Sequence, residues 1–232
     1  MEKTPKLLDG KGYGMIAKCD ISYGSIILTE KPLMIIHSNQ LSNIKDEYEK
    51  ISPEKKHFIE QLYGYDEDLL NVINMNCYVL EADTRSALFY YLSFINHSCE
   101  QNAFYRWNFE QEEMTLIADR DLKCNEEILI SYIEPFQLKR LRQERLSFQY
   151  GFYCLCPLCH RQSFDKEHDQ KWSEYLNEYK TMLKLAETDP ANCLKKCHEL
   201  FMFIKHEYHS SYVQMEQLEK ALTYMDLCNS SL

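Results

Sequence analysis

Apolar and polar positions change their spacing several times along the chain, and each change predicts a different kind of element. From Asp9 to Ile36 short apolar runs alternate with glycines, in the segments GKGYGMIAKCD and SIILTEKPLMII on either side of ISYG. Such runs are typical of short strands joined by turns. Residues 39–72 are richly charged and favour helix, which predicts a helical insert between two groups of strands.

The middle of the chain is again strand-like. The stretch Ala87–Ile95 is aromatic and apolar, and it leads into the polar sequence NHSC. Two further runs, AFYRWNF and MTLIADRDL, are separated by the polar residues EQEE, and this arrangement predicts a β-hairpin. The run NEEILISY, residues 125–132, alternates between polar and apolar positions and predicts one more strand.

A helical pattern begins after Pro135 and ends at Gly151. Its apolar side contains Leu138 and Leu141, which are expected to pack inward. Arg142 is expected on the side of the helix that faces solvent.

Beyond Arg161 apolar residues recur at helical spacing in three groups, with Asp189-Pro190 and the sequence HSSY between them. About three amphipathic helices, packed as antiparallel neighbours through short loops, are therefore expected. Together the patterns predict an α+β protein. A β-rich body covers residues 1–160, and a C-terminal helical domain covers residues 161–232.

Composition narrows the class of protein. The chain has 232 residues, 45% of them apolar and 27% charged, which suits a folded domain and excludes a disordered or fibrous chain. Its formal net charge of −10 argues against a nucleic-acid-coating protein and fits attraction to a basic partner, such as a lysine-rich peptide. Residues 1–10 lack the apolar core of a signal peptide, and no run reaches membrane-spanning length. We therefore expect an intracellular protein without a membrane anchor, in the cytoplasm, the nucleus or both.

Three of the ten cysteines stand close together, in the sequence FYCLCPLCH. Cys154, Cys156 and Cys159 have the spacing with which a short loop supplies thiolates to a tetrahedral zinc ion. The alternative to zinc binding is that the three thiols are buried as small apolar groups, but apolar packing does not require such spacing. A closed zinc site needs a fourth ligand, for which Cys99 and His160 are the candidates.

Several of these segments together resemble the SET-domain lysine methyltransferases. Residues 94–102, FINHSCEQN, resemble the NHSCxxN signature of that family, and EEILISY, residues 126–132, resembles its EELxIxY strand. Gly12-Tyr13-Gly14 resembles the N-terminal GxG turn, and YGFYCLCPLC, residues 150–159, resembles the post-SET segment. The elements occur in the order typical of the family over about residues 9–160, and the ordered set is far more specific than any single motif.

Arg142, Leu146 and Tyr150 are similar to positions in the SMYD branch of the family, from which the chain also departs. That branch carries a MYND zinc finger inside its SET domain, whereas residues 38–75 here contain one histidine and no cysteine. No finger can form, and the helix-prone insert takes its place. The proline usual in the NHSC signature is Gln101 here, and the glycine usual before the paired glutamates is Asn125.

The resemblance implies S-adenosylmethionine as cofactor and a lysine side chain of a protein, histone or otherwise, as methyl acceptor. Tyr132 matches the catalytic tyrosine of the family, whose hydroxyl orients the amine and the methyl group. The positions that match cofactor-binding residues are Lys11, Tyr13, Asn76, Asn96, His97, Tyr132 and Phe152. The resemblance also makes Cys99 the fourth ligand of one structural zinc ion, together with Cys154, Cys156 and Cys159.

Read without the resemblance, some of these residues have simpler roles. His97 would be a core histidine with satisfied hydrogen bonds, and Tyr132 a strand tyrosine with a bonded hydroxyl. Phe152 would be a core phenylalanine beside the cysteine loop.

The acceptor lysine must be neutral to react, and an apolar channel lowers its pKa by disfavouring the charged form. Aromatic side chains suit such a channel because their faces tolerate a cation during entry. The aromatic residues expected near the signature segments are Tyr90, Tyr91, Phe94, Tyr132, Phe152 and Tyr153.

Two other functions compete with methyl transfer. A catalytically silent SET-like scaffold would bind partner proteins through its helical tail, because a fold does not guarantee activity. Tyr132, Asn96-His97 and the GxG residues 12–14 argue against it, since a scaffold has no chemical need for all of them. A zinc-dependent hydrolase is excluded because four thiol ligands leave no open coordination position.

Overall fold

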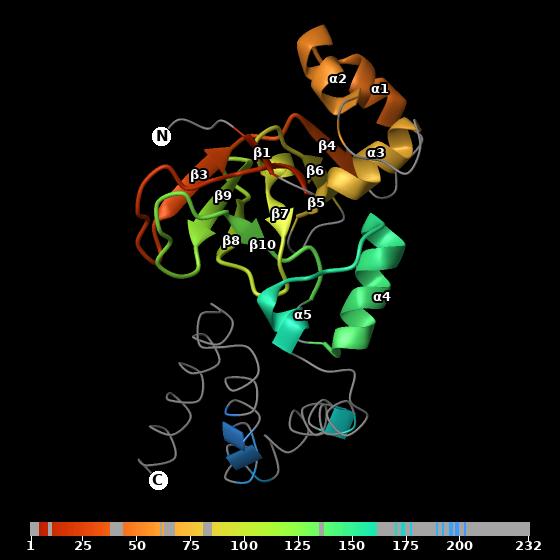
Figure 1. The fold of residues 1–232 in the computed structure, drawn as a ribbon. Coiled ribbons are helices and arrows are strands. Elements are labelled where there is room, and N and C mark those ends of the chain that lie inside the picture. Colours follow the sequence, from red (N-terminus) through yellow and green to blue (C-terminus); the bar gives the residue numbers. More distant parts are fainter. Residues whose placement is uncertain are drawn as a thin grey trace.

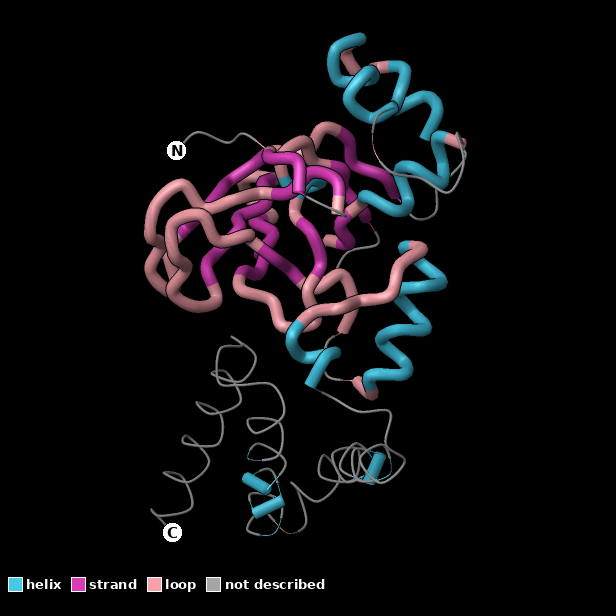
Figure 2. Tube along the Cα trace, in the orientation of Figure 1, coloured by secondary structure: helices cyan, strands magenta, loops and turns pink. Residues whose placement is uncertain are grey.

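The structure is a computed structural model of the chain. It describes residues 5–8, 11–37, 44–60, 62, 68–80, 85–134 and 137–161, together with isolated positions between 170 and 202. Small β-sheets form the body, with α1–α3 gathered at one end of it and α4 and α5 at another (Figures 1 and 2). The described part therefore has the mixed α and β fold that the sequence predicts.

The elements in chain order are β1 (Lys6–Leu8), β2 (Gly12–Gly14), β3 (Ile26–Glu30), β4 (Met34–His37), α1 (Ile44–Glu49), α2 (Pro53–Glu60), α3 (Leu69–Asn76), β5 (Tyr78–Val79), β6 (Arg85–Leu88), the 3-10 helix η2 (Leu92–Phe94), β7 (Asn96–His97), β8 (Ala103–Asn108), β9 (Glu113–Ala118), β10 (Leu129–Ile130), α4 (Lys139–Tyr150) and α5 (Pro157–Arg161). Within the described residues the strands pair as β1–β2, β3–β9–β8, β4–β6–β5 and β7–β10.

The predicted hairpin is confirmed as β8 and β9. The two strands pair antiparallel from Ala103↔Ala118 to Asn108↔Glu113, and β3 adds to the other edge of β9. Alternation along β9 directs every second side chain inward, so that Met114 is fully buried in the main hydrophobic core. This sheet is the platform on which the following segments are laid.

The helices α1–α3 occupy the segment where the sequence predicts a helical insert (Figure 1). Asp68 caps α3, since its carboxylate accepts a hydrogen bond from the N–H of Leu70 at 3.2 Å. Apolar side chains of the helices pack with β4 and β6 into a second core made of Met34, Ile36, Ile44, Phe58, Ile59, Val72, Ile73 and Leu88. This packing brings Asn76, the last residue of α3, to the β-rich body.

The sequences NHSC and EEILISY meet inside the fold. β7 pairs parallel with β10, so that Asn96 lies opposite Leu129 and His97 opposite Ile130. A parallel pair needs a long connection, and the hairpin β8–β9 lies within it. The strand predicted over 125–132 is regular only in β10, because Asn125 lies in a turn and Glu127 forms an isolated antiparallel bridge with Ile16.

Both departures from the family signature have a structural basis. Asn125 has a φ of 68°, in the left-handed region that asparagine tolerates better than most residues other than glycine. Gln101 accepts a hydrogen bond from the N–H of Ser131 at 3.2 Å and donates one to Asp119 at 3.1 Å. Each replacement therefore fits the backbone or the contacts at its position.

The predicted GxG turn is wrong in detail, because Gly12–Gly14 form the strand β2. β2 pairs antiparallel with β1, with Leu7 opposite Tyr13. Directly before β2, the N–H of Lys11 donates to the carbonyl of Leu8 at 3.3 Å.

The helix predicted after Pro135 is confirmed as α4, but its faces differ from the prediction. Gly151 ends it with a φ of 73°, as expected for a C-terminal glycine. Arg142, predicted to face solvent, is completely buried, whereas Leu141, predicted to pack inward, is 37% exposed. The inner face also carries the buried Gln143, because α4 packs against a cysteine-rich loop.

Glu30, the last residue of β3, anchors the segment that leads into β7. Its carboxylate accepts hydrogen bonds from the backbone N–H groups of Tyr90, Tyr91 and Leu92, at distances between 2.8 and 3.1 Å. A carboxylate at the start of η2 is favourable because the free N–H groups of a helix end carry partial positive charge.

The helices expected over residues 161–232 lie outside the described residues, apart from isolated positions, so the domain boundary stays a prediction. None of the described helices combines the length and the apolar composition that a membrane crossing requires.

Candidate functional site

Asn102 joins the NHSC loop to β10. Its side-chain Nδ2 donates to the carbonyl of Glu127 at 2.8 Å, and its Oδ1 accepts from the N–H of Leu129 at 2.7 Å. Its own N–H donates to the carbonyl of Leu129 at 3.0 Å. The side chain is almost completely buried, so these hydrogen bonds replace those that water would make. Asn102 thereby fixes the two signature segments against each other, a role that sequence reasoning did not assign to it.

Tyr132 lies two residues after β10 and reaches back to the segment before β7. Its hydroxyl donates to the carbonyl oxygen of Ile95 at 2.6 Å. Its ring centroid lies 5.2 Å from that of His97 and 5.0 Å from that of Tyr150. Burial raises the pKa of Tyr132 well above its usual value, so the hydroxyl keeps its proton at neutral pH.

A cavity of about 100 Å³ opens beside Tyr132. At the wall of this cavity, the hydroxyl of Tyr78 donates to the carbonyl of Leu92 at 2.8 Å. The ring centroids of Tyr78 and Tyr105 lie 5.0 Å apart. Asn76, whose Nδ2 donates to the carbonyl of Val72 at 2.7 Å, lies at the same wall. The tyrosines that line the cavity are Tyr78, Tyr105, Tyr132 and Tyr150.

This aromatic set differs from the one expected from the sequence, of which only Tyr132 lines the cavity. Tyr90 is exposed, Tyr153 is 70% exposed, and Phe94 packs against the two hydrophobic cores. The expectation relied on closeness to the signatures along the chain. The tyrosines that it missed come from β5, β8 and α4, and only the folded chain brings them together.

Two of the predicted cofactor-binding residues meet at the carboxylate of Glu127, and a third, Tyr13, contacts one of them. The Nζ of Lys11 lies 2.8 Å from Glu127 Oε2, and the Nδ2 of Asn96 donates to Glu127 Oε1 at 2.9 Å. The same Nδ2 lies 3.2 Å from the carbonyl oxygen of Tyr13. The signature contains Glu127, but spacing alone does not reveal which of the paired glutamates points toward Lys11, so the sequence predicts no role for it.

Gly14 leaves room for this group of residues. A Cβ added at this position would lie 2.4 Å from Leu8 Cδ1, 2.9 Å from Asn96 Nδ2 and 3.1 Å from Glu127 Oε1. An added methyl group would therefore force Leu8 to shift and would press on the side chains of Asn96 and Glu127.

His97 connects Tyr132 with the cysteine cluster. Its Nδ1 accepts a hydrogen bond from the N–H of Tyr132 at 3.0 Å, and its Nε2 lies 3.2 Å from the sulfur of Cys99. Burial lowers the pKa of His97 to about 4, so the ring is neutral at pH 7. Because Nδ1 is an acceptor, the proton lies on Nε2 and points at the sulfur. The ring of Phe152 lies 5.9 Å away, which places that residue on the same side of the fold.

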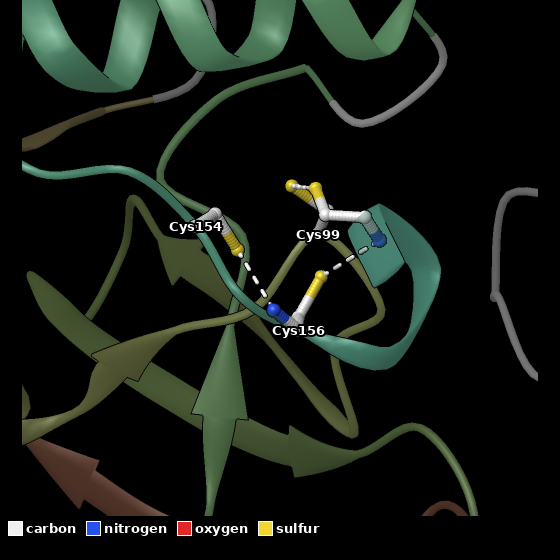
Figure 3. A group of neighbouring side chains, drawn as sticks. Cys99, Cys154 and Cys156 are labelled. Carbon is white, nitrogen blue, oxygen red and sulfur yellow. Dashed lines mark hydrogen bonds between the residues drawn. The ribbon is translucent and has the colours of Figure 1, made fainter. Parts of the chain in front are cut away.

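Four cysteine sulfurs converge beyond Nε2 of His97. Figure 3 labels three of these cysteines, Cys99, Cys154 and Cys156. The Sγ atoms of Cys99, Cys154, Cys156 and Cys159 all lie within 4.8 Å of one another. Cys99 comes from the loop after β7, and the other three come from the loop before α5 and from α5 itself. His160, the other candidate for the fourth ligand, is exposed on α5 and does not belong to this group.

The cluster has the chemistry of a closed zinc site. Hydrogen bonds among the sulfurs raise the pKa of Cys99 and lower that of Cys156, because thiols this close cannot all ionise without a cation between them. The N–H groups of Cys156 and Cys159 face the sulfurs of Cys154 and Cys156 at 3.4 and 3.5 Å, as donors to thiolates would. Four sulfurs in a compact group fit zinc, which favours tetrahedral thiolate coordination.

The sequence profile of the SET domain family matches residues 12–133, more than half of the chain, and the chain belongs to this family. It is 26% identical over 214 residues to the histone-lysine N-methyltransferase set5 of Schizosaccharomyces pombe, covering 90% of this chain and 64% of that protein. It is 36% identical over 91 residues to the SET domain and MYND-type zinc finger protein 6 of the same organism, covering 39% and 18% of the two chains. It is 39% identical over 93 residues to the histone-lysine N-methyltransferase ASHR1 of Arabidopsis thaliana, covering 40% and 18%.

These findings confirm the resemblance drawn from the motifs. The matched region contains β2, the NHSC loop and Tyr132 in one stretch. The chain spans less than two thirds of the length of these relatives.

Proposed function

We propose that this chain is an S-adenosylmethionine-dependent protein-lysine N-methyltransferase. The observation that carries the proposal is the hydroxyl of Tyr132, which lies half-buried at the wall of an aromatic cavity beside the paired signature segments. Membership of the SET domain family supports it, as do relatives named histone-lysine N-methyltransferases.

The cavity suits a lysine side chain that must lose its proton before it reacts. Moving an amine from water to an aromatic wall disfavours the charged form and lowers its pKa. The hydroxyl of Tyr132 donates its own proton to Ile95, so its oxygen is left to accept an N–H of the amine. The hydroxyl of Tyr78 likewise donates its proton to the carbonyl of Leu92, so its oxygen can also accept an N–H of the amine. Two such acceptors at one wall orient the amine and direct its lone pair away from them.

S-adenosylmethionine supplies a methyl group activated by the positive charge on its sulfur. The residues that would hold it are Lys11, Tyr13, Asn76, Asn96, His97, Tyr132 and Phe152. Glu127 supports this set because it fixes the side chains of Lys11 and Asn96. Both ring nitrogens of His97 face protein atoms, so we assign its contribution to the backbone. Phe152 would supply an aromatic face to the adenine.

We further propose that Cys99, Cys154, Cys156 and Cys159 hold one structural zinc ion. Four thiolates leave no open position on zinc, so the site would cross-link the chain without activating water. The cross-link joins the NHSC loop to the loop that carries Phe152. Metal removal should therefore cost folding as well as activity.

The substrate would be a lysine-containing protein, histone or other, in the cytoplasm or the nucleus. The net charge of −10 favours a basic segment around the target lysine. The same charge argues against direct binding of nucleic acid.

Transfer of a labelled methyl group from S-adenosylmethionine to core histones and to a cell extract tests the proposal. Calorimetry on the same protein measures cofactor binding separately. Label on lysine supports the enzyme. The absence of both label and cofactor binding would contradict the proposal and favour the silent scaffold.

A further inference from the structure

Arg142 is a charged side chain that the solvent does not reach. Its exposure is 0%, whereas Arg140 on the same helix is exposed and pairs with Glu144 at 2.7 Å. Arginine stays protonated in proteins, and burying its charge is costly unless polar or charged groups surround it. The neighbours of Arg142 must therefore offset that cost.

The guanidinium lies between the start of α4 and the cysteine cluster. Its Nη1 donates to the carbonyl oxygen of Gln137, and its Nη2 lies 3.6 Å from the sulfur of Cys159. The planar fork of arginine holds two nitrogens in fixed positions for these two contacts, whereas an ammonium group has only one nitrogen.

The cysteine cluster supplies a charge that matches Arg142. Four thiolates around one divalent zinc ion leave a net negative charge, and Cys99, Cys154 and Cys159 are almost fully buried. Electrostatic attraction is strong where little water screens it. A buried cation beside this group is therefore favourable when the thiols are ionised and unfavourable when they are neutral.

Arg142 also completes a set of donors around the sulfurs. Arg142 faces the sulfur of Cys159. Each of the other three sulfurs faces an N–H group at 3.2–3.5 Å. Nε2 of His97 faces Cys99, the N–H of Cys156 faces Cys154, and the N–H of Cys159 faces Cys156.

We propose that Arg142 is a positioning residue of the zinc centre, which balances the charge of the zinc-bound thiolates and holds Cys159 against α4. The proposal rests on zinc binding by the cluster and not on methyl transfer. Gln143 also attaches α4 to the cysteine loop, since its side chain donates to the carbonyl of Cys154 at 2.7 Å and accepts from the N–H of Cys154 at 2.8 Å. Tyr150 at the end of α4 lines the cavity of Tyr132, so the helix links the zinc centre to that wall.

Zinc retention by the full chain tests the proposal. Arg142→Met removes the charge and keeps most of the side-chain length, Arg142→Lys keeps the charge without the fork, and Arg140→Met is the matched control on the same helix. Each zinc-loaded protein is mixed with a chelator, and zinc release is followed with a metal indicator. We expect Arg142→Met to bind zinc about 10–100-fold more weakly, as for other residues that contact metal ligands. Arg142→Lys should be intermediate, and Arg140→Met should match the wild type.

Cobalt substitution separates the role in charge balance from a role in packing. Without the nearby cation the thiolates become more electron-rich, so the thiolate-to-cobalt charge-transfer band of Arg142→Met should move to lower energy. The ligand-field bands should keep the pattern of a tetrahedral four-sulfur site, and Arg140→Met should show no change.

Wild-type zinc retention in both Arg142 variants, or an unshifted charge-transfer band, overturns the proposal. A wild-type chain that binds no zinc overturns it as well. If Arg142→Met does not fold, Arg142→Lys decides: zinc retention weaker than that of the wild type supports the proposal, and wild-type retention overturns it. Methyl transfer by the same samples is a separate readout, so failure of this proposal is distinguishable from failure of the proposed activity.

Discussion

The backbone N–H of Tyr132 donates to Nδ1 of His97 at 3.0 Å, and the same imidazole faces the sulfur of Cys99 at 3.2 Å. One neutral ring therefore links the residue with the proposed catalytic hydroxyl to a proposed zinc ligand. Because both ring nitrogens are engaged, the ring cannot turn without losing a contact at one end. The positions of Tyr132 and of the cysteine cluster are thus coupled through His97.

Replacing His97 with asparagine should lower stability and methyl transfer together. Asparagine is too short to reach both partners, and each buried hydrogen-bonding group left unpaired costs about 1–3 kcal/mol. Urea unfolding of the zinc-loaded protein measures the loss. His160→Asn makes the same change at an exposed position, where surface substitutions stay within about 0.5 kcal/mol. Equal stability of the two variants would show that the ring makes no such link.

Replacing Cys99 with serine should remove the zinc and lower the melting temperature. The hydroxyl is a poor substitute for a thiolate ligand, and a structural zinc site contributes directly to folding. Elemental analysis gives the zinc content, and circular dichroism gives the melting curve. Cys124→Ser, at an exposed cysteine, serves as the control and should retain the metal. Full zinc content in Cys99→Ser would exclude Cys99 as the fourth ligand.

Replacing Gly14 with alanine should weaken cofactor binding. The added methyl group would overlap Leu8 and press on Asn96 and Glu127, which we place at the cofactor site. Calorimetric titration with S-adenosylmethionine measures the effect. Gly24→Ala is the comparison, since Gly24 has open space and a φ of 74°; it should cost about 1 kcal/mol of stability and leave cofactor affinity unchanged. Equal affinities for the two variants would remove Lys11, Asn96 and Glu127 from the cofactor site.

The contribution of Glu126 to the stability of the protein should be lost in acid. Burial alone would raise its pKa, but the side chain of Arg120 and the N–H of Lys123 outweigh burial and hold the pKa below its usual value. A carboxyl group whose pKa is lower in the folded state stabilises the protein above its unfolded pKa, and this contribution is lost as the pH falls through the folded pKa. Between about pH 5 and about pH 3 the wild type should therefore lose stability more steeply than Glu126→Gln. Urea midpoints across that range measure the two slopes, and parallel curves would contradict the assignment.

The parts of the fold that the sequence predicts well have local signals. The hairpin β8–β9 follows from two alternating runs with a polar turn between them, and the end of α4 follows from Gly151. The thiols of Cys154, Cys156 and Cys159 stand close together because they share one short loop.

The predictions that failed concern contacts between distant segments. Helical periodicity placed Arg142 outside because it assumes an apolar partner, whereas α4 packs on a polar cysteine cluster. The cavity wall was assigned to aromatic residues near the signatures along the chain, but Tyr78, Tyr105 and Tyr150 converge from three separate elements. The contact of Glu127 with Lys11 likewise joins residues far apart in sequence.

Methyl transfer by Tyr132→Phe tests the central claim most directly. The change removes only the hydroxyl, so the aromatic wall and the cofactor site stay in place. We predict that Tyr132→Phe still binds S-adenosylmethionine but transfers the methyl group at least about 100-fold more slowly, the usual effect of losing one oriented polar group at a reaction centre. Tyr23→Phe, the same change at an exposed tyrosine, should transfer at the wild-type rate. Transfer by Tyr132→Phe at the wild-type rate would contradict the account.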